Sequence, residues 1–94
     1  MTTGAIDLDS LRNAALRNGR DCAEIAADIS PGRWSADQRK FYLDGLAVAL
    51  AETFPLGPSR FLEFADVIVG TARAAFDSRL AELGITVDPA ETRH

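Results

Sequence analysis

The stretch Pro58–Leu83 constrains the fold of this chain more than any other segment. After its first residue no proline interrupts it, and its first half, from Phe61 to Val69, would place apolar side chains on nearly every side of a helix. A helix with so wide an apolar surface has to be covered from more than one direction. We therefore expect one long helix over residues 59–83, with other parts of the structure packed around it.

Capping residues and helix breakers divide the rest of the chain. Ser35 and Gln38 have the spacing of a capping box, which predicts a helix that begins at residue 36. Pro31 disfavours a helical conformation in the residue before it, and Gly19 has the freedom to adopt the left-handed conformation that ends many helices. The predicted helices cover residues 8–18, 22–29, 36–54 and 59–83.

These segments predict an all-α, small four-helix domain, in which two short helices precede a long antiparallel helical hairpin. The hairpin is expected because Pro55, Gly57 and Pro58 break the chain within four residues, and so short a connection folds the next helix back. Ninety-four residues suit one domain. We expect a mobile lead over residues 1–6, the domain over 7–85 and a tail over 86–94.

Composition limits the classes of function. A hydrophobic content of 47% with 26% charged residues is ordinary for a globular protein, and no basic segment followed by an apolar run indicates a signal peptide. We therefore expect a cytoplasmic protein with no membrane partner. The net charge of −4 argues against a nucleic-acid partner, because binding to phosphate depends on clustered Lys and Arg.

Residues suited to catalysis or metal binding are scarce. His94 is the only histidine and stands at the end of the predicted tail, where no surrounding structure would hold a general base. Cys22 lies between Asp21 and Glu24, which oppose a thiolate, so a buried structural cysteine is the better interpretation. The acidic residues of the last helix fit a solvated edge rather than a metal site. We predict no catalytic residue, no metal, no cofactor and no enzymatic activity.

Surplus apolar surface is the main functional signal. The first two predicted helices contribute few large side chains, and the buried stripe of the second is predicted to be Cys22, Ile25, Ala26 and Ile29. The last two helices are apolar over most of their circumference, and large exposed apolar patches mark interfaces. We therefore predict a homodimer, with helix 59–83 and part of helix 36–54 at the contact.

The predicted interface combines large apolar side chains with one glycine that would permit a close helix approach. Two of its members have an alternative interpretation: Trp34 fits the edge of the core at least as well as a partner anchor, and Gly70 fits a tolerated surface glycine. The predicted interface residues are Trp34, Phe41, Tyr42, Phe61, Phe64, Ile68 and Gly70.

Three functions remain open. The first is a non-enzymatic protein interaction module, such as an adaptor, accessory subunit or small inhibitor, that binds itself and possibly another protein. The second is a DNA-binding regulator with a helix-turn-helix-like pair over about residues 22–46. The third is a small-ligand carrier or enzyme subunit, with a pocket between the last two helices. The aromatic residues expected to line that pocket are Phe41, Tyr42, Phe61 and Phe64.

Overall fold

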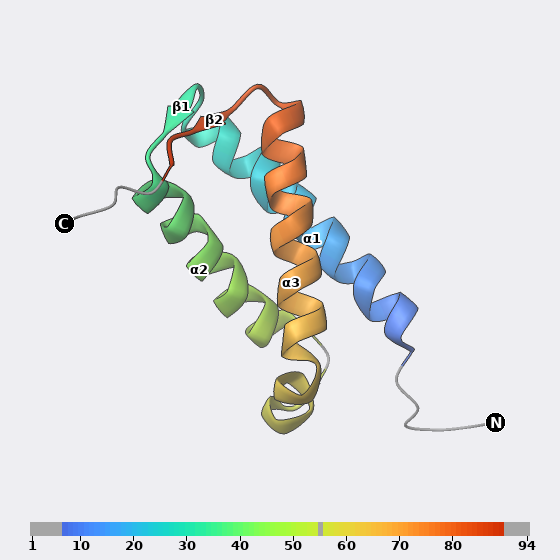
Figure 1. The fold of residues 1–94 in the computed structure, drawn as a ribbon. Coiled ribbons are helices and arrows are strands. Elements are labelled where there is room, and N and C mark those ends of the chain that lie inside the picture. Colours follow the sequence, from blue (N-terminus) through green and yellow to red (C-terminus); the bar gives the residue numbers. More distant parts are fainter. Residues whose placement is uncertain (1–6, 55, 90–94) are drawn as a thin grey trace.

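A computed structural model describes residues 7–54 and 56–89, and within these ranges the chain forms three helices and one pair of short strands (Figure 1). Helix α1 spans both of the short helices predicted at residues 8–18 and 22–29 as one continuous helix, so the predicted count of four helices is wrong. In chain order the elements are α1 (Leu8–Ile29), β1 (Arg33–Trp34), α2 (Ala36–Thr53), α3 (Pro58–Glu82) and β2 (Thr86–Val87).

The correction lies at Gly19, where α1 continues without interruption. Gly19 does not take the positive φ of a helix stop, which the described glycines Gly32 and Gly84 do adopt. It marks instead a close approach between two helices, because a Cβ at this position would lie only 2.1 Å from the carbonyl oxygen of Ala72 in α3. Glycine stands there because a larger residue would hold the helices apart.

Small residues make up the buried face of α1. Ala15, Gly19, Ala23 and Ala26 follow a helical spacing and are all buried. The two helices cross in a roughly parallel sense, since Gly19 faces Ala72 and, five residues further along α1, the Glu24 carboxylate accepts a hydrogen bond from Arg79 of α3 at 3.0 Å. Helix α1 therefore supplies the cover for α3 that the two predicted short helices could not.

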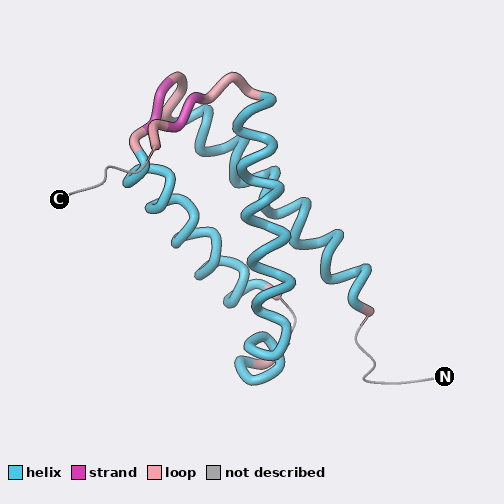
Figure 2. Tube along the Cα trace, in the orientation of Figure 1, coloured by secondary structure: helices cyan, strands magenta, loops and turns pink. Residues whose placement is uncertain are grey.

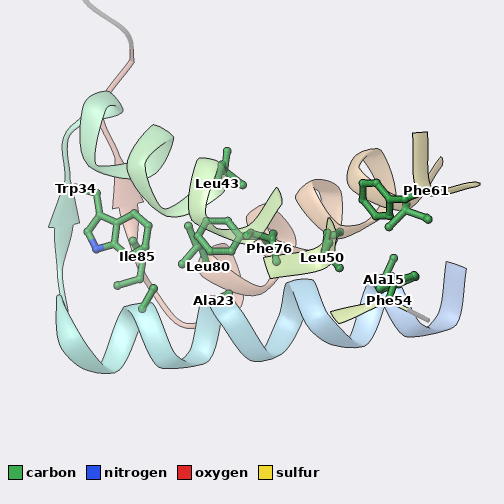
Figure 3. Close-up of a cluster of buried hydrophobic side chains, with 14 residues drawn as sticks. Ala15, Ala23, Trp34, Leu43, Leu50, Phe54, Phe61, Phe76, Leu80 and Ile85 are labelled. Carbon is green, nitrogen blue, oxygen red and sulfur yellow. The ribbon is translucent and has the colours of Figure 1, made fainter. Parts of the chain in front are cut away.

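The core extends along the whole bundle (Figure 3). At one end Trp34 is fully buried, stacks on Tyr42 at a centroid distance of 4.9 Å, and donates its indole N–H to the carbonyl of Ser30 at 2.6 Å. At the other end Phe54 meets Phe61 edge-on. Between these ends the core includes residues from all three helices, of which α1 contributes the small residues Ala15, Ala23 and Ala26.

Helices α2 and α3 run in opposite directions (Figure 1), and local signals define their ends. The Ser35 hydroxyl accepts a hydrogen bond from the Gln38 amide at 3.1 Å, which confirms the predicted cap. Beyond α3, Gly84 has a φ of 80° and the Ile85 amide donates to the Leu80 carbonyl at 3.0 Å. This is a Schellman motif, and it turns the chain so that Ile85 packs into the core.

Strands β1 and β2 pair in parallel beyond the ends of α1 and α3 (Figure 2). The Thr86 amide donates to the Gly32 carbonyl at 3.1 Å, and the Asp88 amide donates to the Trp34 carbonyl at 2.9 Å. The Arg33 guanidinium adds an ion pair with Asp88 at 2.7 Å. The region predicted as a tail from residue 86 thus begins with a strand; residues 1–6 and 90–94 lie outside the described residues.

Candidate functional site

An apolar groove of about 580 Å³ lies between α1 and α2. Cys22 of α1 contributes to one side of it, and Phe41, Gly45 and Val48 of α2 contribute to the other. The core-facing side chains of α2 recur at Leu43, Leu46 and Leu50, and Leu46 also lines the groove. The groove therefore borders the core at Leu46 and opens outward beside the exposed Phe41 and Val48.

The helical period explains why α2 exposes apolar residues there. Phe41 and Val48 stand seven residues apart, so they lie on one face of the helix, and their side chains are 73% and 58% exposed. Gly45 lies between them without a side chain, and nothing comes within 4 Å of the place where its Cβ would be. A ridge interrupted by a gap is the kind of surface into which another helix packs.

Helix α1 extends the apolar surface beyond the groove. Cys22, Ile25 and Ile29 recur at i, i+3 and i+7 on one flank, and the two isoleucines are 62% and 66% exposed. At the end of this flank, the hydroxyl groups of Ser30 and Tyr42 lie 3.3 Å apart, which joins the end of α1 to α2. We call the groove together with Ile25 and Ile29 the α1–α2 face.

The α1–α2 face offers contact rather than covalent chemistry. Cys22 is half-buried, and desolvation raises the pKa of its thiol, so the nucleophilic thiolate is disfavoured at neutral pH. Within residues 7–54 and 56–89, no group of three or more His, Cys, Asp or Glu side chains is placed to hold a metal ion. His94 lies outside the described residues.

Two other hollows lie next to an ion pair between α2 and α3, with volumes of about 440 and 360 Å³. Arg39 lines both, and its guanidinium donates two hydrogen bonds to Asp77, at 2.9 and 2.7 Å. The hydrogen bond to Asp77 raises the pKa of Arg39. Because this guanidinium is already bound to a carboxylate, it is poorly placed to bind an additional anion.

The structure places the predicted interface residues in different environments. Trp34, Phe61 and Ile68 are buried inside the chain, so they have no surface to offer a partner in this structure. Gly70 is exposed, and no atom outside its own helix and neighbours lies within 4 Å of a Cβ built there, so the close helix approach occurs at Gly19 instead.

The remaining predicted interface residues are Phe41, Tyr42 and Phe64. Phe41 is exposed and Tyr42 half-buried, and both line the α1–α2 groove. Phe64 is half-buried in α3. Phe61 packs against Phe54, about 20 Å along α2 from Phe41 at 1.5 Å per residue, so Phe41 and Phe61 do not line one pocket between α2 and α3.

Three basic residues within the segment 22–46, which would form the DNA-binding helix pair, are engaged with carboxylates. Arg39 binds Asp77, Arg33 binds Asp88, and the Lys40 ammonium lies 2.8 Å from Asp44. Helix α1 also continues through the first half of the proposed motif, and β1 occupies part of its turn. The DNA-binding alternative stays a prediction, and these contacts weigh against it.

Sequence reasoning missed part of the α1–α2 face. Ile25 and Ile29 follow a regular helical spacing and were assigned to a buried stripe, but they point away from the small-residue face that meets α3. A clue was present in the chain, since Ala15, Ala23 and Ala26 form a second stripe with Gly19. Helix α1 therefore has two apolar stripes, and only the small-residue stripe packs in the core.

No protein-family model, curated protein or solved structure matches the chain. Within the described ranges, none of the helices combines the length and the apolar character needed to cross a membrane.

Proposed function

We propose that this protein is a non-enzymatic protein interaction module that binds through the α1–α2 face. One observation carries the proposal: Ile25, Ile29, Phe41 and Val48 are each more than half exposed, with Phe41 and Val48 lining the groove and the two isoleucines continuing the stripe that begins at its Cys22. Single exposed apolar residues are common on protein surfaces, whereas a group of large ones around a groove is typical of an interaction site.

The packing of the bundle supports the choice of this face. The apolar residues of α3, on which the predicted dimer contact depended, include Ile68, Phe76 and Leu80, and all three are buried within the chain. Apart from Leu62 of α3, the large apolar side chains that are more than half exposed therefore lie on α1 and α2. Phe41 in particular combines a large aromatic surface with high exposure, as binding anchors do.

A double variant tests the proposal. Phe41→Glu with Val48→Glu places two charges on the α1–α2 face at positions whose exposure leaves the core intact. Leu62→Glu is the matched control, because Leu62 is 75% exposed on α3 and does not line the groove. Circular dichroism should show the same helix content for all three proteins.

Partners from the source cells are then captured with each protein and compared. We expect proteins that are retained by the wild-type chain and by Leu62→Glu but lost from the double variant. The proposal fails if the double variant retains the same partners. Light scattering after size-exclusion chromatography addresses the predicted homodimer separately: a dimer that the double variant abolishes would identify the partner as a second copy.

A further inference from the structure

We propose that the α1–α2 face receives a basic amphipathic helix of another protein, which packs as the fourth helix of the bundle. This inference rests on the proposed function and names the partner class. The groove lies between two helices, and Gly45 opens a gap in the Phe41 and Val48 ridge. A helix that inserts a side chain into such a gap buries apolar residues spaced three and four apart.

The acidic edge of α2 indicates the charge of the partner. Asp37, Asp44 and Glu52 recur at intervals of seven and eight residues along the side of α2 that carries Phe41 and Val48, and Asp44 and Glu52 line the groove. Lys40 pairs with Asp44, but no ion pair within the described chain involves Asp37 or Glu52. This edge therefore has a net negative charge.

The opposite edge of the face, on α1, is also acidic. Asp21 and Asp28 stand seven residues apart, next to the flank with Ile25, and both are exposed without an ion pair in the described structure. Arg17, one turn before Asp21, is the cation of this edge. Together the two edges have five carboxylates against two cations.

This charge distribution favours a basic partner over a second copy. In a symmetric dimer through this face, acidic edges would lie near acidic edges, and like charges at an interface suppress association. A helix with an apolar stripe flanked by Lys or Arg matches both parts of the surface: its stripe covers Phe41 and Val48, and its cations face the carboxylates of the edges.

Two synthetic helical peptides test the inference with the full chain. Both carry leucine at i, i+3, i+4 and i+7, and they differ only in having lysine or glutamate at the flanking positions. Fluorescence anisotropy of each labelled peptide measures binding. We expect the lysine peptide to bind at least about tenfold more tightly than the glutamate peptide, and to weaken as salt is added.

Variants distinguish binding at the face from general attraction between opposite charges. Phe41→Glu with Val48→Glu makes the protein more acidic, so non-specific attraction would strengthen whereas binding at the face should fall at least about tenfold, as the anchors are lost. A second variant, Asp37→Asn with Glu52→Gln, should lower affinity about threefold to tenfold while keeping the apolar floor. Leu62→Glu should bind like the wild type.

Each contrary outcome has a separate meaning. Equal binding of the two peptides, lost in the Phe41→Glu, Val48→Glu variant, would overturn the basic partner and leave the proposed interaction face intact. Lysine-peptide binding that persists or strengthens in that variant would overturn the inference as non-specific attraction. Binding of neither peptide would also overturn it, and the capture experiment would then decide the proposed function independently.

Discussion

Replacing Gly19 by alanine tests the fold at its closest helix contact. A Cβ at this position would lie 2.1 Å from the Ala72 carbonyl oxygen and 2.9 Å from the carbonyl carbon. Both atoms belong to the backbone of α3, so no side-chain rotation relieves the overlap. Since Cβ atoms essentially never come within 3.0 Å of another heavy atom, the helices must move apart by about 0.9 Å, the difference between 2.1 and 3.0 Å.

Two opposing effects set the magnitude for Gly19→Ala. Alanine is favoured over glycine inside a helix by about 1 kcal/mol. Overpacking in a close-packed interior costs about 1–3 kcal/mol, and separating two helix backbones belongs at the upper end of that range. We therefore expect a net loss of about 1–2 kcal/mol in the free energy of unfolding. In a domain of this size, that lowers the Tm by about 4–15 °C.

Urea and thermal unfolding followed by circular dichroism measure this loss. Gly70→Ala is the matched control, because Gly70 is exposed in the middle of α3 and no neighbouring group lies within 4 Å of the new Cβ. It should gain about 1 kcal/mol from helix propensity alone. If Gly19→Ala proved as stable as the wild-type chain, or gained stability as Gly70→Ala should, the account of α1 packing on α3 would be refuted.

Two further changes probe the core end and the surface ion pairs. Trp34→Phe removes the N–H donor from the Ser30 carbonyl and leaves a void, so it should lower the free energy of unfolding by about 2–4 kcal/mol; a loss under about 1 kcal/mol in urea unfolding would contradict the buried hydrogen bond. Hydrogen bonding to Arg79 lowers the pKa of Glu82 from its ordinary 4.5, so its carboxylate stabilises the fold above that pH and this contribution is lost as pH falls through the lowered value. Glu82→Gln should accordingly be slightly less stable than the wild type at pH 7, and the difference should close on acidification below 4.5; a difference independent of pH would count against the ion pair.

Local signals in the sequence predicted much of α2 and α3. Ser35 caps α2 because its hydroxyl reaches an amide three residues away, and Gly84 ends α3 because only glycine adopts a φ of 80° without strain. Both effects act within a few residues, so neighbouring residues suffice to predict them. Pro58 at the first position of α3 is likewise a local signal, because proline is favoured at the start of a helix.

Gly19 shows where local reasoning fails. The same residue type suits a helix stop and a close helix crossing, and the two uses differ only in whether another backbone lies beside it. The residue in contact, Ala72, is more than fifty positions away in the chain. Reading Gly19 as a stop produced the fourth helix and removed the cover of α3, and so led us to expect an interface on α3, where the fold buries Phe61 and Ile68.

The candidate site was predictable only in part for the same reason. Phe41 and Tyr42 were named from their apolar character, and both line the groove, but nothing local distinguishes Phe41 from Phe61, which the fold buries. The strand pair beyond the ends of α1 and α3 has two residues in β1 and two in β2. Two residues are too few for a periodic pattern to predict a strand.

The sequence by itself determined a helical chain, the ends of its last two helices and an excess of apolar side chains, because caps, breakers and periodicity act over one or two turns. Tertiary structure decided which apolar stripe of each helix enters the core. In α1 the core takes the small residues Ala15, Gly19, Ala23 and Ala26, because small side chains let the backbones of α1 and α3 approach and pack closely. The larger Ile25 and Ile29 stay exposed. The larger stripe is thereby left outside, where a partner can reach it.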